Sequence, residues 1–203
     1  YALYMVLREA AGGTGHLSWT IPYRTRDPRA LQTFAASHGK RLDFIRWTQY
    51  EFFREWNDIL AYAHAHGVQI IGDIPIYVSG DSADCWSDPK LFQLDRHLRP
   101  LAVAGCPPDA FAPDGQKWGN PLYNWTRMEK DGFAWWKSRL RQCFRMYDLI
   151  RLDHTRGFQA YFSIPADGPA PEGRWRRGPG GHFFREIEKE FGSGSFIAED
   201  LGH

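Results

Sequence analysis

Apolar residues recur at helical spacing through the first third of the chain. Residues 1–11 fit a helix, and residues 12–28 fit a loop rich in Gly, Pro and Thr. From Pro28 to His66 the pattern predicts one long amphipathic helix, or two in series, that ends before Gly67. The apolar positions that carry this prediction are Ile45, Phe52, Trp56, Ile59, Leu60 and Ala63.

Three short apolar runs then alternate with helical segments. "VQIIGDIPIYV" (68–78) is apolar on both faces and predicts a strand buried in a parallel sheet. "YDLIRLD" (147–153) and "GSFIAED" (194–200) predict two more strands. Helices are expected at about 129–145 and at 182–191 between them. This alternation is typical of parallel βαβ units, and therefore of an α/β fold.

Two long segments interrupt these units. Residues 79–124 have no clear period and predict an irregular loop subdomain, with a small hairpin around residues 92–103. Residues 157–180 are rich in Gly and Pro and predict another loop. Long loops after strands favour an α/β barrel over an open doubly wound sheet, although both place their sites at the carboxyl ends of the strands.

Composition narrows the class of protein. The chain has 203 residues, 43% of them hydrophobic and 16% aromatic, and a formal net charge of +1, so nucleic acid is not an expected partner. The short basic cluster at residues 174–177 fits a solvated loop. Three separated cysteines without a CxxC pair indicate a reduced, cytoplasmic chain, and no run is long enough to cross a membrane. Both ends of the chain look cut, which suggests part of a longer protein.

Acidic residues mark the end of each predicted strand. Asp73 lies in the first apolar run, Asp153 ends the second, and Glu199 and Asp200 end the third. Because parallel strands end at one edge of a sheet, these side chains are expected to meet there. Asp73, Asp153 and Asp200 could instead hold a metal ion.

Arg151 and Asp153 are two residues apart in a strand and so share a face. A carboxylate fixed beside a cation stays ionised and can act as a nucleophile. Glu199 follows the apolar run "FIA", whose drier environment suits a general acid. Cleavage of a glycosidic bond requires such a pair of carboxyl groups. Taken singly, Arg151–Asp153 also fits a structural ion pair, and His154 also fits an ordinary core histidine.

An aromatic loop adds a second signal. "PPDAFAPDGQKWGNPLYNW" combines turn residues with Trp118, Asn120, Tyr123 and Trp125. Aromatic rings can lie against the C–H faces of sugars, while amides and carboxylates bind their hydroxyls. The alternative is a packed loop whose aromatic residues belong to the core. Trp135 and Trp136 lie in a predicted helix and are expected in the core.

Several of these motifs together resemble the amylomaltases, the 4-α-glucanotransferases of glycoside hydrolase family 77. They run in order along almost the whole chain: "GDIPIYV", "VAGCPPDAF", "GQKWGNPLYNW", "DGFAWW", "IRLDHTRGF" and "FIAEDLG". The resemblance implies a (β/α)8 barrel of the α-amylase type, of which residues 1–203 would supply roughly strands three to five, truncated at both ends. It also implies a retaining transfer of α-1,4-glucan segments between maltooligosaccharides or amylose chains, without a metal or other cofactor.

The resemblance also implies roles for individual residues. Asp153 would be the nucleophile and Glu199 the general acid/base. The residues expected to bind substrate are Arg151, His154, Asp73, Tyr77, Trp118, Gly119 and Asn120. A third carboxylate of the family pattern would lie beyond His203, so this chain alone is not expected to be active. An α-glucan hydrolase and a non-catalytic glucan-binding fragment remain the alternatives.

Overall fold

The computed structural model describes residues 1–110 and 112–199. The chain divides into two compact units. The first unit comprises Tyr1–Ile59 and Asp81–Pro89, and the second comprises Leu60–Gly80 and Lys90–His203. All the residues expected to form the site lie in the second unit.

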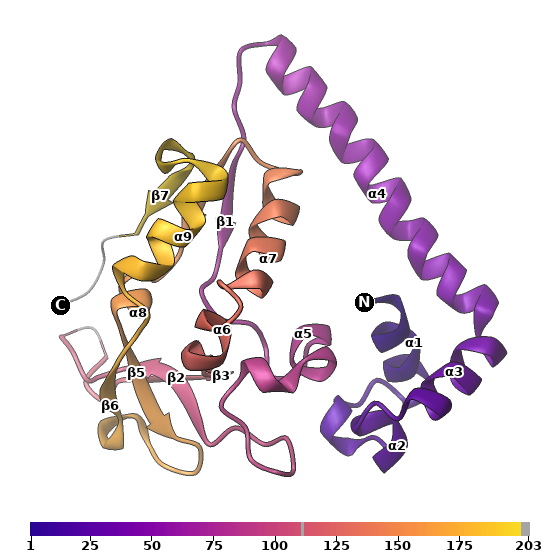
Figure 1. Cartoon of the computed structure of the whole chain (residues 1–203), viewed down its shortest axis with the longest axis horizontal. Helices are drawn as coiled ribbons and strands as arrows, with labels where there is room; N and C mark the ends of the chain where they lie inside the picture. Colours follow the sequence, from indigo (N-terminus) through magenta and orange to yellow (C-terminus); the bar gives the residue numbers. More distant parts are fainter. Residues whose placement is uncertain (111, 200–203) are drawn as a thin grey trace. The chain divides into compact units, whose positions relative to one another are not determined.

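The elements follow the predicted order of helices and strands, with additions in the segments predicted as loops. The helices are α1 (Ala2–Ala10), α2 (Ile21–Arg24), α3 (Pro28–Ser37), α4 (Gly39–Ala65), α5 (Ala83–Ser87), α6 (Trp125–Glu129), α7 (Ala134–Phe144), α8 (Arg156–Gln159) and α9 (Gly181–Phe191). The strands are β1 (Ile71–Ile74), β2 (Ala102–Cys106), β3 (Gln116–Pro121), β4 (Leu149–Leu152), β5 (Ala160–Pro165), β6 (Arg174–Arg177) and β7 (Phe196–Ala198). Figure 1 shows their course along the chain.

The first unit is helical. The side chain of Asp27 accepts a hydrogen bond from the Ala30 N–H at 2.8 Å and caps α3, whose first residue is a proline. Its core joins α1, α3 and α5, which contribute the buried residues Tyr4, Phe34 and Trp86. Of the two arrangements predicted for Pro28 to His66, the structure has two helices in series, α3 and α4.

A three-stranded parallel sheet in the order β1–β4–β7 forms the centre of the second unit, as the alternation predicted. In its register, Arg151 of β4 lies between Asp73 of β1 and Ile197 of β7. One prediction is wrong: β1 is not buried on both faces, since exposed and buried residues alternate and Ile71 is 54% exposed.

A second, antiparallel sheet, in the order β3–β2–β5–β6, corrects the prediction that residues 79–124 and 157–180 are irregular. Strands from both segments pair with each other and enclose a small core of Val103, Phe162, Ile164 and Ala170. Their pairing is not local, since β2 pairs with both β3 and β5. The expected small hairpin near residues 92–103 is present: Leu94 and Pro100 form an antiparallel bridge, the Asp95 N–H donates to the Arg99 carbonyl at 2.8 Å, and the Leu101 N–H donates to the Gln93 carbonyl at 3.0 Å.

Aromatic rings fill the core of the second unit. Phe133, Trp136, Phe158 and Phe183 are at most 1% exposed, and their ring centroids are separated by 4.4 to 5.5 Å along the cluster. The predicted apolar face of α7 is thus confirmed for Phe133, Trp136 and Leu140. In Figure 1, α7 and α9 run beside the parallel strands that they support.

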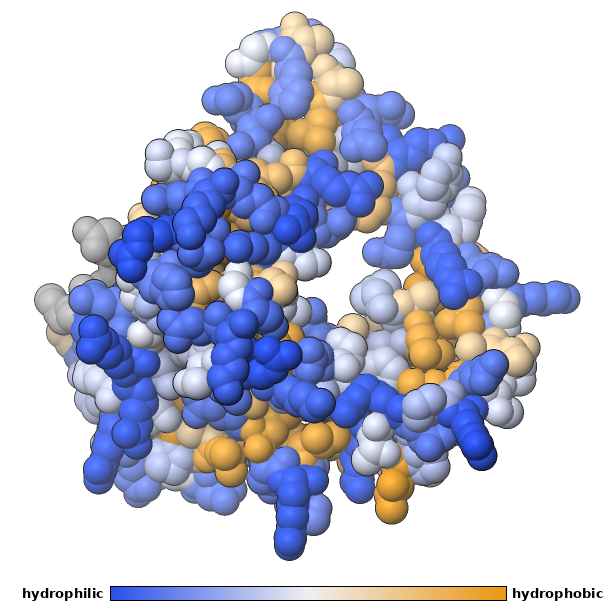
Figure 2. Space-filling model, viewed as in Figure 1, coloured by the Kyte–Doolittle hydropathy of each residue, from blue (hydrophilic) through white to orange (hydrophobic). Residues whose placement is uncertain are grey.

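The visible surface is mainly hydrophilic, and apolar residues appear on it as separate patches (Figure 2). Arg174, Arg176 and Arg177 are exposed as predicted, but they belong to β6 rather than to a loop. Within residues 1–110 and 112–199, none of the helices combines the length and the apolar character needed to cross a membrane.

Candidate functional site

The acidic residues meet at the carboxyl edge of the parallel sheet. Asp153 and Glu199 directly follow β4 and β7, and Asp73 is the third residue of β1. The Asp153 N–H donates to the Ile74 carbonyl at 3.0 Å, and the Glu199 N–H donates to the Leu152 carbonyl at 3.2 Å. The hydrogen bonding of the sheet therefore extends to both acidic residues and fixes where their side chains begin.

One guanidinium joins all three carboxylates. Arg151 Nη1 donates to Asp73 Oδ1 at 2.6 Å and to Asp153 Oδ1 at 3.2 Å, and Nη2 lies 3.4 Å from Glu199 Oε1. The hydrogen bond to Asp73 is the main reason why the pKa of Arg151 is raised. The predicted contact between Arg151 and Asp153 is present, and Asp73, which is expected at the same edge, makes the shorter contact.

Glu199 lies in a more polar environment than its apolar neighbours predicted. Its side chain is 15% exposed, and Oε2 accepts a 2.6 Å hydrogen bond from the His154 backbone N–H. With Arg151 on the other oxygen, both carboxylate oxygens have a donor. The low exposure fits the drier environment expected from the apolar neighbours, but the turn after β4 also turns a backbone N–H toward the carboxylate.

His154 occupies a backbone conformation that is uncommon for residues other than glycine. Its φ is 53°, in the left-handed region, and this turn directs its N–H to Glu199. The ring is buried, which lowers the pKa of His154, and its Nε2 has no hydrogen-bond partner among the described residues. Gly157 keeps the space open, since a Cβ there would lie 2.9 Å from His154 Cδ2.

Trp118, Gly119 and Asn120 lie in an irregularity of the β2–β3 ladder. Val103 pairs with Pro121, whereas Gly105 pairs with Lys117, so these three residues lie outside the regular register. Such a bulge re-aims side chains. Gly119 adopts a φ of 82°, which glycine tolerates without a steric cost.

Trp118 lies beside the acidic cluster. Its ring meets the His154 ring edge-on at 5.0 Å and lies 6.3 Å from the Tyr77 ring, measured between centroids. It remains 39% exposed, and its Nε1–H donates to Gln116 Oε1 at 2.9 Å. Gln116 was not anticipated as a site residue; its position two residues before Trp118 in an extended run could have indicated it.

Asn120 and Tyr77, also expected to bind substrate, are engaged in contacts within the protein. Asn120 Nδ2 donates to the Val78 carbonyl at 3.0 Å, which ties the loop to the segment after β1. Tyr77 is 6% exposed, and burial raises the pKa of its phenol. The Tyr77 ring lies beside Trp118, and Asn120 belongs to the same bulge of β3 as Trp118.

Two aromatic residues of the predicted platform belong to the core instead. Tyr123 is 1% exposed and its hydroxyl donates to the Ile76 carbonyl at 2.7 Å. Trp125 is 9% exposed and packs against Phe158. The alternative of a packed loop is therefore correct for these two residues, and the candidate platform is reduced to Trp118.

The metal hypothesis gains no support from the described residues. Among residues 1–110 and 112–199, no group of three or more His, Cys, Asp and Glu side chains is placed to hold a metal ion. Asp200, which that hypothesis used, lies outside the described residues. Asp73 and Asp153 instead share the Arg151 guanidinium.

The fold and the site together define an α/β protein whose acidic cluster lies at the carboxyl edge of a parallel sheet, beside an exposed tryptophan. In α/β barrel enzymes the active site lies at this edge of the sheet, and enzymes that cleave glycosidic bonds use a pair of carboxyl groups. The sequence profile of the 4-alpha-glucanotransferase family (Glyco_hydro_77) matches residues 1–203, and the chain belongs to that family. The resemblance found in the sequence motifs is thereby confirmed.

Named relatives agree with this assignment. The chain is 46% identical to a 4-alpha-glucanotransferase of Thermus thermophilus over 203 residues and 43% identical to one of Streptococcus pneumoniae over 205 residues. All of the chain takes part in both matches, but it spans only 41% and 40% of these relatives. An amylomaltase structure from Streptococcus agalactiae, in complex with acarbose, matches with a TM-score of 0.95 and 40% identity, covering 100% of this chain and 41% of the other.

Proposed function

We propose that the protein containing this chain transfers α-1,4-glucan segments between maltooligosaccharides by a retaining double displacement. The observation that carries the proposal is the Arg151 guanidinium, which holds Asp73, Asp153 and Glu199 at one edge of the parallel sheet. Membership in the 4-alpha-glucanotransferase family supports the choice of reaction. The acarbose complex of the S. agalactiae amylomaltase supports a glucan-like ligand.

In the first displacement, Asp153 attacks the anomeric carbon of the donor sugar. Its carboxylate is 44% exposed and oriented by Arg151, so it is both accessible and fixed. Glu199 gives its proton to the departing glycosidic oxygen, and the released glucan leaves. The glucan remaining on the enzyme is then esterified to Asp153.

In the second displacement, Glu199 takes a proton from the 4-hydroxyl of an incoming glucan. That oxygen attacks the anomeric carbon and expels Asp153, so the configuration is retained. Transfer exceeds hydrolysis when the acceptor is held and water is excluded. The β3 bulge of Trp118, Gly119 and Asn120 is our candidate for this shielding. Arg151, His154, Asp73 and Tyr77 would surround the donor sugar.

The sheet order supports a barrel for the longer protein. β1, β4 and β7 are adjacent, parallel and joined by helical crossovers, as are neighbouring strands of a (β/α)8 barrel. We infer that they are roughly its third to fifth strands. Residues 1–203 would then be part of one catalytic domain, from which the segment at about 79–124 projects as a subdomain.

Replacing Asp153 with Asn in the full-length protein tests the central role. The amide cannot form the ester, so disproportionation of maltotriose should fall by about 10³-fold or more, while the unfolding temperature stays close to that of the unaltered protein. Asp58→Asn, an exposed change on α4, is the matched control. Retained transfer by the Asp153→Asn variant would refute the assignment.

The products distinguish the alternatives. A ladder of longer and shorter glucans from maltotriose indicates transfer, whereas only shorter products indicate an α-glucan hydrolase. Binding of maltotriose without any product by the full-length protein would indicate a glucan-binding role. The cytoplasmic location expected from the cysteines stays a prediction.

A further inference from the structure

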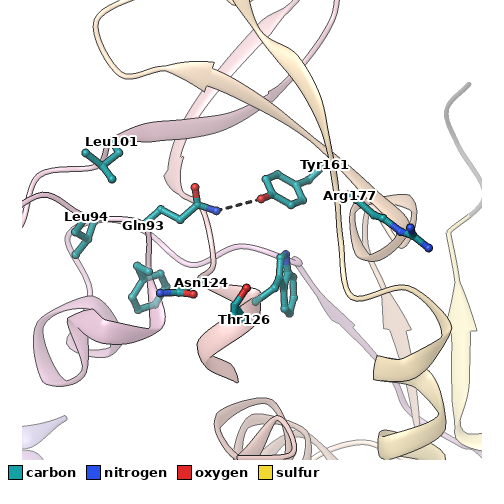
Figure 3. A pocket seen from close by; sticks show the side chains of 9 residues that line it. Gln93, Leu94, Leu101, Asn124, Thr126, Tyr161 and Arg177 are labelled. Atoms are coloured by element: carbon teal, nitrogen blue, oxygen red, sulfur yellow. Dashed lines mark hydrogen bonds between the residues drawn. The ribbon is translucent and has the colours of Figure 1, made fainter. Parts of the chain in front are cut away.

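A cavity lies in the same unit as the candidate site but is lined by other residues. Its volume is about 370 Å³, within the range of sites that bind small molecules. It lies between the chain around Phe92, the start of α6, and strands β5 and β6 (Figure 3). The residues that line it are Phe92, Gln93, Leu94, Leu101, Asn124, Trp125, Thr126, Tyr161 and Arg177.

The polar lining is fixed before any ligand arrives. Gln93 Nε2 donates to the Tyr123 carbonyl at 2.9 Å and to the Tyr161 hydroxyl oxygen at 3.1 Å. Asn124 Oδ1 accepts from the Arg127 N–H at 3.1 Å. Rotamers held in this way lose little entropy on binding. This cavity is therefore preorganised by hydrogen bonds to the surrounding backbone and between two of its side chains.

Several hydrogen-bonding groups remain available. Within the described part of the chain, Gln93 Oε1, Asn124 Nδ2 and the hydroxyl of Thr126 have no protein partner, and the Tyr161 hydroxyl keeps its own proton to donate. Donors and acceptors thus lie side by side, with Leu94 and Leu101 forming an apolar flank (Figure 3). A sugar ring has the matching surface, with hydroxyls at its edge and C–H groups on its faces.

The charge of the lining selects a neutral ligand. The lining contains no carboxylate, so nothing in it attracts a cation. Arg177 is its one charged residue, and its guanidinium points away from Gln93 and Asn124 (Figure 3). An anion would lack the convergent cations that usually bind phosphate or carboxylate groups.

Aromatic residues separate this cavity from the candidate site. Phe92 lies 5.5 Å from Tyr123, Tyr123 lies 5.8 Å from Tyr77, and Tyr77 lies 6.3 Å from Trp118, measured between ring centroids. A row of aromatic rings therefore leads from Phe92, which lines the cavity, to Trp118 at the candidate site.

We propose that this cavity is a second glucan-binding site, which takes a pyranose unit of a neutral α-glucan apart from the Asp153–Glu199 pair. The choice of glucan rests on the proposed function. Gln93, Asn124, Thr126 and Tyr161 would bind hydroxyl groups, and Leu94 and Leu101 would contact a ring face.

The test measures maltotriose binding by calorimetry. Every variant is made in the full-length protein that carries Asp153→Asn, so that the glucan binds without turnover. Thr126→Val removes one hydroxyl, and Asn124→Asp removes the amide donors but keeps the cap of α6. Each should weaken one class of maltotriose sites by about five-fold, the effect of one lost hydrogen bond. Trp118→Ala should weaken the other class. Asn57→Asp, an exposed change on α4, is the control for the added charge and should change neither.

A single class of sites, or two classes that do not respond to Thr126→Val and Asn124→Asp, would overturn the second site. Unfolding temperatures close to that of the background establish that the variants are folded. Transfer by the protein with Asp153 intact is measured in parallel. Its absence would reject the proposed function, but a maltotriose site weakened by Thr126→Val would still support the cavity as a sugar site.

Discussion

Arg151 is the residue on which the geometry of the site depends. Its two terminal nitrogens contact three carboxylates that come from three different strands. A guanidinium has a rigid planar fork, so it fixes the directions of its partners as well as their charges. Asp153 and Glu199 are therefore positioned relative to each other through a common partner rather than by direct contact.

At this scale we expect Arg151→Lys to be far from conservative. The single ammonium keeps the charge but cannot reach Asp73, Asp153 and Glu199 with the same geometry. Misplacement of the reacting groups should lower kcat for transfer by about 10²-fold. Steady-state kinetics of the full-length protein measure this, with Arg29→Lys, a change at an exposed position of α3, as control. A kcat close to that of the control would mean that only the charge of Arg151 matters.

The individual elements differ in how well the sequence predicts them. The periodicity predicts α7, α9 and the order of β1, β4 and β7, because each of these elements has a continuous apolar face. The antiparallel sheet was missed, because its strands are short and lie among Gly and Pro residues. Their partners are also distant in the chain, such as Ala102 and Pro165.

The site residues likewise differ in how well the sequence predicts them. Acidic strand ends are visible in the sequence, and the parallel sheet brings them together as predicted. Contacts made by loops are not visible in this way. The His154 N–H bonded to Glu199 depends on a left-handed turn, and the core position of Trp125 depends on packing against Phe158. A local pattern specifies neither.

Gly105 tests how closely β2 and β3 must approach. A Cβ at this position would lie 2.0 Å from the Gln116 carbonyl oxygen and 2.4 Å from Ile164 Cδ1. Gly105→Ala should therefore lower the free energy of unfolding by about 1–3 kcal/mol, as overpacking does. Urea denaturation measures it, and Gly194→Ala, where a Cβ meets nothing within 4 Å, is the control. Equal stability of both variants would mean that the ladder can relax around Gly105.

For the molecule as a whole, one buried and one half-buried histidine link stability to pH. In the first unit, His16 is 3% exposed, and burial lowers its pKa, although Asp81 opposes this effect and Arg26 reinforces it. Asp81 also contacts Arg8 and the Tyr4 hydroxyl, and its Oδ1 lies 3.6 Å from His16 Nδ1, which is longer than a hydrogen bond. Burial lowers the pKa of His154 in the second unit as well.

We expect stability to fall as the pH drops below about 6.5, the ordinary pKa of histidine. In that range the unfolded chain binds protons that the folded chain does not, so protons favour unfolding. Above pH 6.5 the histidine is neutral in both states, so its contribution to the free energy of unfolding no longer changes with pH. Unfolding free energies between pH 7.5 and pH 5.5 measure the slope, which His16→Gln should reduce and exposed His97→Gln should not. An unchanged slope in His16→Gln would contradict this source.

The central claim is that Asp153 forms a covalent bond with the glucan while Glu199 serves as acid and base. The most direct measurement is mass spectrometry of the full-length Glu199→Gln variant after reaction with α-maltotriosyl fluoride. Fluoride departs without protonation by Glu199, so the first displacement still occurs in this variant. The second displacement needs Glu199 as a base, so the covalent intermediate should accumulate. We predict a maltotriosyl adduct on the peptide that contains Asp153. An adduct on a different residue, or glucan products formed without any adduct, would contradict the account.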